Sequence, residues 1–270
     1  MEFWQALILA VIEGLTEYLP VSSTGHIILG SALMGIEGGT FVKDYTVIVQ
    51  FGAILSVLVV YRTRILAALR RGPRVFYLLT LSFLPAAFFG LLFGKKIDAL
   101  LGDVSVVAWS LLLGGFVLIF VDRLAARFEN SAKSLDGLAI PYKDGVLIGL
   151  AQCLALVPGV SRSAASIVGA MGLGFTRKTA AEFSFFLAVP TLTAATCYKL
   201  LKMGPSLSRE TLPLILVGNV VAFIVGILAI KSFIGFLEKH GFFWFGVYRI
   251  LVGALILVFL YSGHSLKMLD

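Results

Sequence analysis

The chain has 270 residues, of which 59% are hydrophobic and 14% are charged, and its mean hydropathy is +0.99. Ordinary soluble domains contain about 25% charged residues, so this composition excludes a soluble globular domain, a disordered chain and a small disulfide scaffold. The net charge of +7 arises from basic residues that flank apolar runs, which is typical of membrane-topology signals and argues against nucleic-acid binding. Because the uncharged runs have the length of helices and exceed the ten-residue strands of a barrel, the sequence predicts an all-α polytopic membrane protein in a lipid bilayer.

Eight apolar regions follow one another along the chain, and six of them are uncharged runs of 16–20 residues. At 1.5 Å per residue, such runs cover roughly 24–30 Å, which is about the thickness of the hydrocarbon core of a bilayer. We therefore expect six transmembrane helices, over residues 45–61, 75–94, 104–121, 183–198, 211–230 and 250–266. Cys153 and Cys197 lie in apolar segments without metal-ligand spacing, so we expect both to be buried thiols.

The remaining two apolar regions, residues 3–36 and 145–175, are interrupted. The first contains two glutamates and a histidine, the second contains an arginine, and each is broken by a proline followed by small hydroxyl residues. Such a sequence is unsuited to one continuous helix, so we expect each region to form a re-entrant hairpin of two half-helices. Irregular backbone at membrane depth is tolerated only where it lines a protein or water cavity, which makes both hairpins candidates for a functional site.

The two interrupted regions resemble each other at a distance of half the chain. Residues 14–19 (GLTEYL) match residues 149–154 (GLAQCL), each is followed by a proline, a valine and two serines, and two further segment pairs recur in the same order. We therefore predict one membrane domain, residues 1–270, built from repeats 1–135 and 136–270. Each repeat contains one hairpin and three spans, and since three is odd, the repeats are expected to have inverted topology, as in many transporters.

The distribution of Lys and Arg predicts the orientation in the membrane. The connections on one side of the predicted spans carry 13 basic residues, and those on the other side carry seven. The more basic side is expected to be cytoplasmic. Both termini and the opening of the first hairpin should then face outward, away from the cytoplasm.

The first hairpin carries the acidic residues. Glu13 and Glu17 are four residues apart, which places them on one helix face, about 6 Å apart along the axis. Two poorly hydrated carboxylates at this distance cannot both stay charged without help, so either one binds a proton or a divalent cation neutralises the pair. The alternative is a pair of snorkelling side chains at a helix end. We favour metal or proton chemistry because a polar turn follows directly.

That turn contains Ser22, Ser23, Thr24, Gly25 and His26. It begins a new half-helix, whose free N–H groups and positive dipole end attract phosphate, and we expect Ser22 to be the N-cap. By themselves, the hydroxyls would be helix caps and the histidine would be a core residue with satisfied hydrogen bonds. Next to two carboxylates, they indicate a nucleophile beside a general acid or base.

The turn of the second hairpin supplies a cation. Arg162 lies between Ser161 and Ser163 after a Pro-Gly pair, and its guanidinium can bind two phosphate oxygens at once. A salt bridge to one of the glutamates is the alternative, and it is compatible with an empty site. Gln50 and Glu182 occupy matching positions in the repeats. Gln50 is a candidate ligand, and Glu182 is either a partner of the site residues or a charge at a helix end.

Two more polar residues lie within or beside apolar runs. We interpret Arg249, next to Tyr248, as an anchor at the membrane interface, and Asn219 as a residue packed between helices. The carboxylates, hydroxyls, histidine and arginine of the two hairpins together suit phosphoryl chemistry on a substrate with a lipid tail. Transport of a phosphorylated lipid is the alternative.

The same residues carry a resemblance to a known family. Residues 13–26 (EGLTEYLPVSSTGH) resemble the first signature of the bacterial undecaprenyl-diphosphate phosphatases of the bacitracin-resistance type, residues 158–163 (PGVSRS) resemble the second, and residues 182–185 (EFSF) also match. The resemblance extends over essentially the whole chain. The second signature usually ends in threonine, and this chain has Ser166 there, so a hydroxyl group is kept.

The resemblance implies hydrolysis of undecaprenyl diphosphate to undecaprenyl phosphate, the lipid carrier for peptidoglycan precursors. It places the protein in the bacterial inner membrane with a site that faces the periplasm, and it implies a divalent cation, magnesium or calcium. The competing class is a flippase or scramblase of undecaprenyl phosphate, and both activities could operate in one protein. A homodimer is the candidate oligomeric state.

Carried over by position, the resemblance assigns roles to the residues named above. Glu13 and Glu17 form the acidic, metal-binding motif, Ser23 or His26 is the attacking group, and Arg162 clamps the phosphate. If Ser23 attacks, His26 or Glu17 must take its proton. The groups expected to contact substrate phosphate are Ser22, Thr24, Gly25, Gln50, Ser161, Arg162 and Ser163, with Glu182 and Ser166 as their partners.

Overall fold

The computed structural model describes residues 1–36, 39–101, 103–127, 133, 136–203, 209 and 211–262, and within these ranges the chain forms helices and no β-sheet. The α-helices are α1 (Phe3–Thr16), α2 (Ser23–Leu33), α3 (Thr40–Ile48), α4 (Gln50–Val60), α5 (Arg62–Arg70), α6 (Arg74–Leu101), α7 (Val104–Arg127), α8 (Tyr142–Gln152), α9 (Arg162–Gly172), α10 (Arg177–Met203), α11 (Thr211–His240) and α12 (Phe243–Tyr261). Two short 3₁₀ helices, η2 (Gly137–Ala139) and η3 (Cys153–Leu156), lie on either side of α8. The predicted all-α class is confirmed.

Six helical segments are long and apolar enough to cross a membrane, and each overlaps one of the six predicted runs. They are Phe41–Val60, Arg74–Ile97, Val104–Ala125, Arg177–Lys202, Thr211–His240 and Phe243–Tyr261. The last segment begins seven residues before the predicted run, which started at residue 250 because Arg249 interrupts the apolar sequence. The helix continues through Arg249 since the folded protein provides hydrogen bonds for its guanidinium, as described below.

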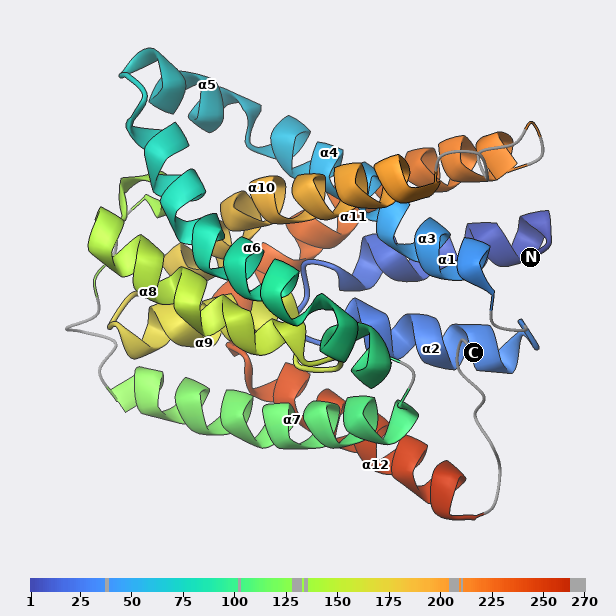
Figure 1. The fold of residues 1–270 in the computed structure, drawn as a ribbon. Helices are drawn as coiled ribbons and strands as arrows, with labels where there is room; N and C mark the ends of the chain where they lie inside the picture. The colour runs from blue at the N-terminus through green and yellow to red at the C-terminus, as the bar shows by residue number, and fades with distance from the viewer. Residues whose placement is uncertain are drawn as a thin grey trace.

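The interrupted regions form two pairs of shorter helices that enter the bundle from opposite ends (Figure 1). Helices α1 and α2 lie at the end where the chain begins, and α8 and α9 lie at the other end. The turns that join each pair, residues 17–22 and 153–161, meet near the middle of the molecule. The longer helices run between the two ends and enclose these turns. Functional groups on both turns are therefore brought to one place.

The second helix of each pair begins in the same way. Ser22 is the N-cap of α2 and accepts a hydrogen bond from the Gly25 N–H at 3.4 Å, as predicted, and Ser161 caps α9 by accepting from the Ala164 N–H at 3.2 Å. The backbone φ angles of these two serines are +70° and +77°, and they are the only non-glycine residues with positive φ in the described part of the chain. Side chains rarely occupy this region, so both turns store backbone strain.

Helices α7 and α12 are packed backbone against backbone. A Cβ added at Gly115 would lie 2.6 Å from the Gly246 carbonyl oxygen, and one at Gly253 would lie 2.8 Å from the Ala108 carbonyl oxygen. Small residues permit such close helix contacts in membranes, where packing replaces the hydrophobic driving force. Asn219 of α11 also joins two helices, as predicted, because its Oδ1 accepts the Gly52 N–H of α4 at 2.7 Å.

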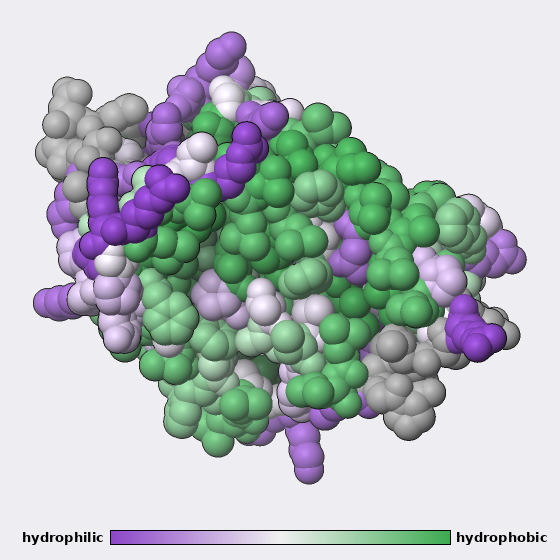
Figure 2. Space-filling view, turned by 90° about the horizontal axis from the view of Figure 1, so that it is seen from above, coloured by the Kyte–Doolittle hydropathy of each residue, from purple (hydrophilic) through white to green (hydrophobic). Residues whose placement is uncertain are grey.

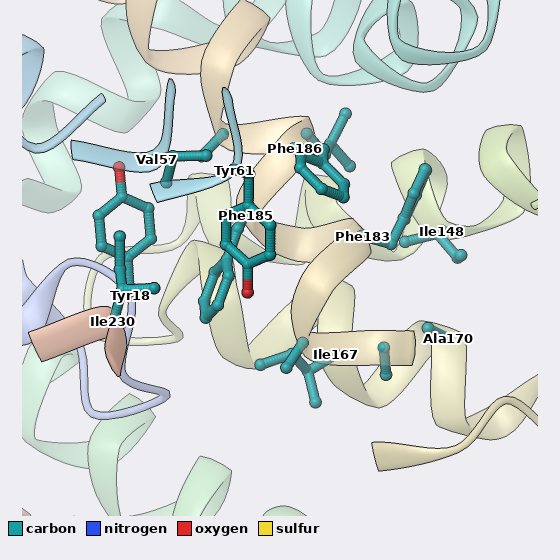
Figure 3. Close-up of a cluster of buried hydrophobic side chains, with 14 of the residues drawn as sticks. Tyr18, Val57, Tyr61, Ile148, Ile167, Ala170, Phe183, Phe185, Phe186 and Ile230 are labelled. Carbon is teal, nitrogen blue, oxygen red and sulfur yellow. The ribbon is translucent and has the colours of Figure 1, made fainter. Parts of the chain in front are cut away.

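A buried aromatic core surrounds α10 (Figure 3). The Phe185 ring lies with its centroid 5.3 Å from that of Tyr18 in the first turn and 6.3 Å from that of Tyr61 after α4. On another face of α10, Phe183 lies beside Ile148 of α8 (Figure 3). The core therefore holds both helix pairs against α10, which fixes the turns that they carry.

The face of the molecule seen in Figure 2 is mainly apolar over its middle, and most of its hydrophilic residues lie toward the edges. Large exposed hydrophobic side chains occur on all of the membrane-length helices, for example Leu91, Phe120 and Leu201. This distribution is that of a multi-pass membrane protein. Cys153 is half-buried and Cys197 is exposed, so the expectation of a buried thiol is wrong for Cys197, which lies on the outer surface of α10.

Candidate active site

A polar cavity of about 100 Å³ lies where the two turns meet. The first turn and the start of α2 contribute a carboxylate and hydroxyls, the second turn and the start of α9 contribute a hydroxyl and a guanidinium, and α4 and α10 complete the wall. The lining residues are Glu17, Ser22, Ser23, Thr24, Gln50, Ala155, Pro158, Gly159, Ser161, Arg162 and Leu192. The structure thus brings together eight of the residues that the sequence singled out: Glu17, Ser22, Ser23, Thr24, Gln50, Ser161, Arg162 and, through its hydrogen bond to Ser161, Ser163.

Glu17 is at the centre of the cavity wall and has two different partners. Its Oε2 accepts a hydrogen bond from Ser23 Oγ at 2.8 Å, and its Oε1 accepts one from Arg162 Nη2 at 2.9 Å. The Glu17 side chain is only 5% exposed, so the ion pair and the hydroxyl contact are shielded from water. The salt bridge considered from the sequence is therefore present, and it is formed by the glutamate that also holds the hydroxyl.

Arg162 is held in place from the opposite side by α10. Its Nη1 donates to the Ser184 carbonyl oxygen at 2.8 Å and to Ser184 Oγ at 3.1 Å. Ser166 Oγ donates to Ser184 Oγ at 2.8 Å, so Ser166 supports Arg162 through this intermediate hydroxyl. The guanidinium also lies 5.9 Å from the centre of the Tyr18 ring. Arg162 Nε is buried without a hydrogen-bond partner, which leaves one donor for an incoming group.

Two helix N-termini point into the same cavity. Helix α2 begins at Ser23 and helix α9 begins at Arg162, and both of these first residues line the cavity. The first N–H groups of a helix have no partner within the helix, and the helix dipole places partial positive charge there. Together with Arg162, this arrangement is a cradle for an anion such as phosphate.

Glu13 lies one turn before Glu17 on α1, and the Glu17 N–H donates to the Glu13 carbonyl oxygen at 3.0 Å. The Glu13 side chain is completely buried, and neither of its carboxylate oxygens has a hydrogen-bond partner. Buried carboxylates without partners are costly, so these oxygens are suited to a cation. No group of three or more His, Cys, Asp or Glu that could hold a metal ion occurs among the described residues. The carboxylates of Glu13 and Glu17 match the usual coordination of magnesium, which binds one or two carboxylates and completes its shell with water and phosphate oxygens.

His26 faces a different cavity. One ring nitrogen, Nδ1, lies 2.8 Å from the Ser22 carbonyl oxygen, and Nε2 lies 2.6 Å from the Tyr248 hydroxyl, against whose ring the imidazole is stacked. Both side chains line an apolar cavity of about 560 Å³ between the first helix pair and helices α11 and α12. The structure therefore separates His26 from the Glu17–Arg162 pair, although it lies three residues after Ser23.

Three other predicted residues have structural partners. Gly25 faces α7, where a Cβ would lie 3.0 Å from Leu111 Cδ1. Ser163 Oγ donates to the Leu19 carbonyl oxygen at 2.8 Å and so ties the two turns together. Ser161 and Ser163 share a hydrogen bond of 2.9 Å between their hydroxyls.

Glu182 lies away from the cavity and pairs with Arg64. Two hydrogen bonds of 2.7 and 2.9 Å join the two side chains, and Asp136 adds a third contact to Arg64 at 3.0 Å. These partners, Glu182 first, raise the pKa of the Arg64 guanidinium above its ordinary value. Since Glu182 lies two residues before Ser184 on α10, it can act on the site only through that helix.

Arg249 is the residue that the sequence interpretation placed wrongly. It is completely buried and is therefore not an anchor at the membrane interface. Its guanidinium donates to carbonyl oxygens of both turns, including Pro20 at 3.1 Å and Gly159 at 3.0 Å. The signal available in the sequence was the arginine inside a region that otherwise reads as one span, but the preceding aromatic residues favoured the interfacial interpretation.

Comparison with known proteins gives one consistent result. The profile of the family described as bacitracin resistance protein BacA matches residues 6–255. The chain is 48% identical to an undecaprenyl-diphosphatase of Bdellovibrio bacteriovorus over 99% of this chain and 100% of that protein. It is also similar to undecaprenyl-diphosphatases of Flavobacterium psychrophilum, at 48% identity over the full length of both chains, and of Porphyromonas gingivalis, at 49% identity over 98% of this chain and 99% of the relative. The chain therefore belongs to the bacitracin resistance protein BacA family.

Proposed function

We propose that this protein is an undecaprenyl-diphosphatase, which hydrolyses undecaprenyl diphosphate to undecaprenyl phosphate and inorganic phosphate. The observation that carries the proposal is the Ser23–Glu17–Arg162 arrangement in a buried cavity onto which two helix N-termini converge. The names of the full-length relatives support the same activity. By restoring the lipid carrier of peptidoglycan synthesis, this reaction accounts for the family's link with bacitracin resistance.

The terminal phosphate of the substrate binds in the polar cavity. The N–H groups at the starts of α2 and α9 and the free Arg162 Nε donate to its oxygens, and the hydroxyls of Ser22, Thr24 and Ser161 and the amide of Gln50 surround it. Charge spreads over the three equatorial oxygens in phosphoryl transfer, so donors arranged in advance around them lower the barrier. The lipid tail stays in the apolar surroundings of the bilayer.

Ser23 is the attacking group. Its oxygen forms a bond to the terminal phosphorus while the bond from that phosphorus to the bridging oxygen breaks, and undecaprenyl phosphate leaves. The Ser23 proton passes to Glu17 Oε2, the atom that already accepts its hydrogen bond. Glu17 then gives this proton to the leaving undecaprenyl phosphate and is a carboxylate again. Water attacks the phosphorus of the phosphoserine while Glu17 takes a proton from the water. Glu17 returns that proton to the Ser23 oxygen as inorganic phosphate leaves. His26 is less suited to attack, because it does not line the polar cavity and both of its ring nitrogens already have hydrogen-bond partners.

A divalent cation, magnesium or calcium, is the proposed cofactor. Glu13 and Glu17 would hold it, and the unpartnered oxygens of Glu13 support this assignment. Bound there, the cation would supply positive charge to the phosphate oxygens of the substrate. Arg162 already donates a hydrogen bond to Glu17 Oε1, so the arginine and the proposed cation would share the Glu17 carboxylate.

The enzyme is proposed to lie in the bacterial inner membrane with the cavity open to the periplasm and both termini on the periplasmic side. The two helix pairs are proposed to be re-entrant hairpins of an inverted repeat. Their matched serine caps and their entry from opposite ends support this arrangement (Figure 1). All proposed site residues come from one chain, so the mechanism does not depend on a homodimer. The relatives named above carry the name of an enzyme, and the flippase alternative has no support among them.

Phosphate release from undecaprenyl diphosphate by the purified protein in detergent tests the proposal, since no transport can occur there. We expect turnover by the wild type and a loss on the order of 10²–10³ in kcat for Arg162→Ala. Arg162→Lys should recover little, because a single ammonium group keeps the charge but cannot contact Glu17 and Ser184 and also offer a separate donor to the phosphate. Arg71→Lys, a change at an exposed arginine, is the matched control and should leave kcat unchanged. Wild-type kcat in folded Arg162→Ala would contradict the assignment.

A further inference from the structure

Arg249 is a buried cation without an acidic partner. It is the largest of the fully buried side chains, and no carboxylate in the described part of the chain forms an ion pair with it. An isolated charge inside a membrane protein is expensive, so such residues are kept where they have a function. The proposed mechanism does not use Arg249, because the polar cavity is lined by Arg162 instead.

The guanidinium of Arg249 uses all five of its N–H donors on backbone carbonyls. Two carbonyls belong to α7 (Ser110 and Leu111), one to the first turn and two to the second turn. The acceptors and their distances are Leu111 at 3.4 Å from Nε, Pro20 at 3.1 Å and Val160 at 3.0 Å from Nη1, and Ser110 at 3.1 Å and Gly159 at 3.0 Å from Nη2. One side chain thus joins three separate segments of the chain.

The carbonyls that Arg249 binds lie immediately before the groups of the active site. Pro20 precedes Ser22 and Ser23 by two and three residues, and Gly159 and Val160 directly precede Ser161 and Arg162. Both serine caps have positive φ, so these turns are strained and need outside support to keep their shape. A misplacement of about 1 Å between reacting groups can cost on the order of 10² in rate.

From these contacts we infer that Arg249 is a positioning residue, which fixes the two turns relative to each other and thereby sets Ser23 and Glu17 against Arg162. This inference rests on the proposed function for its effect on catalysis, and on the contacts alone for its effect on the turns. The five bonds need a planar group with donors on three nitrogens. A lysine offers three donors on a single atom, so it cannot replace them.

The structure offers a second way to disturb the guanidinium while the arginine is kept. A Cβ at Gly114 of α7 would collide with Arg249 Nη2 and would lie 3.0 Å from its Cζ, so Gly114→Ala must displace the guanidinium. Gly94 of α6 is a matched control, because a Cβ there meets no atom within 4 Å and Gly94→Ala is the same change within a helix.

The test compares Arg249→Lys, Gly114→Ala and Gly94→Ala as purified proteins, with hydrogen–deuterium exchange of the turns and kcat and KM for undecaprenyl diphosphate. We expect amide exchange in residues 17–25 and 157–164 to be at least tenfold faster in the first two variants and unchanged in Gly94→Ala. In the first two, kcat should fall on the order of 10² with little change in KM. Adding Arg162→Lys to Arg249→Lys should cost less than the product of the two single effects, since both act on one alignment.

Several results would overturn the inference. Unchanged amide exchange in the turns of folded Gly114→Ala would overturn the inference, whatever the activity of that variant. The exchange rates in Gly114→Ala also test the inference if Arg249→Lys does not fold. Near wild-type kcat in folded Arg249→Lys would show that charge alone suffices and would exclude a geometric role. If the wild type releases no phosphate from undecaprenyl diphosphate, the proposed function fails, and exchange in the turns still decides whether Arg249 holds them.

Discussion

Ser23 and His26 lie three residues apart on α2 and yet enter different cavities. Residues at this spacing are neighbours on a helix surface, so the sequence alone could not assign the nucleophile. Each side chain is directed by its own partner: Glu17 accepts from the Ser23 hydroxyl, and the Tyr248 hydroxyl and a backbone carbonyl hold His26. These contacts support the proposal that Ser23, and not His26, is the attacking group.

A pair of alanine substitutions separates the roles. Ser23→Ala removes the proposed nucleophile, so kcat should fall at least as far as in Arg162→Ala. His26→Ala removes a side chain that does not line the polar cavity and should cost about tenfold or less, the equivalent of about 1–1.5 kcal/mol. Phosphate release under single-turnover conditions measures both, after each variant has been shown to fold. The reverse order of effects would make His26 the attacking group.

Glu13 differs from Glu17 in having no partner for its carboxylate oxygens. Glu13→Gln should therefore raise the magnesium concentration needed for half-maximal phosphate release, because one hard, charged ligand is lost. It should not lower the thermal stability, since it removes a buried charge that no donor compensates. Chelation of the metal should abolish activity in the wild type. Glu238→Gln, at an exposed carboxylate, is the control.

An unchanged magnesium titration in Glu13→Gln would contradict the metal assignment. A large fall in melting temperature would show instead that Glu13 has a structural partner in the membrane. Glu17→Gln is expected to lower both the rate and the response to metal, because Glu17 serves the hydroxyl as well as the proposed ion.

At the scale of single elements, the starts of α2 and α9 combine a helix cap with a strained backbone. Ser22→Ala loses the cap, which costs about 1 kcal/mol, and keeps the strain of positive φ. Ser22→Gly loses the same hydroxyl and relieves strain of about 1–3 kcal/mol. We therefore expect the glycine variant to be more stable than the alanine variant by about 1 kcal/mol or more in thermal unfolding.

Ser232, in the interior of α11, is the control for this comparison, because there the order should reverse. Glycine within a helix is about 1 kcal/mol less favourable than alanine, so Ser232→Ala should be the more stable variant of that pair. If alanine is the more stable variant at position 22 as well as at position 232, the positive φ of Ser22 carries no strain.

The elements that sequence reasoning predicted best are the long ones. Uncharged runs located all six membrane-length helices, because hydropathy over 16–20 residues depends little on tertiary context. The start of α12 was missed for the opposite reason. An arginine in an apolar run looks like the end of a span unless five carbonyls from distant segments are already known to surround it.

For the candidate site, the sequence predicted which residues meet but not the partners that hold them. The residue types and the meeting of the two turns followed from the motifs, because Pro-interrupted apolar regions with polar residues need a common cavity. The partners did not follow. Nothing in the sequence indicates that Glu182 binds Arg64, or that Ser184 is the group that holds Arg162 from behind. Such pairings depend on how α10 is rotated in the bundle.

For the whole molecule, the order of the helices predicts that the two termini lie on the same side of the membrane. The connections on the opposite side carry 13 basic residues, so that opposite side should be cytoplasmic and the termini should lie in the periplasm. A periplasm-specific reporter fused to either terminus should be active, and a cytoplasm-specific reporter inserted in the connection 62–74 should be active. Cytoplasmic signal from either terminus would contradict both the orientation and the inverted repeat.

The closest helix packing joins the two halves of the chain rather than the helices within one half. Helix α7 packs on α12, α1 and α4 pack on α11, and α6 packs on α8. A protein of half this length would therefore have no complete core and only half of the cavity. On the proposed inverted repeat, such a half could complete both by pairing with a second copy inserted in the opposite orientation. If the repeats descend from one ancestral gene, the same proposal implies that this gene encoded a protein that inserted in both orientations.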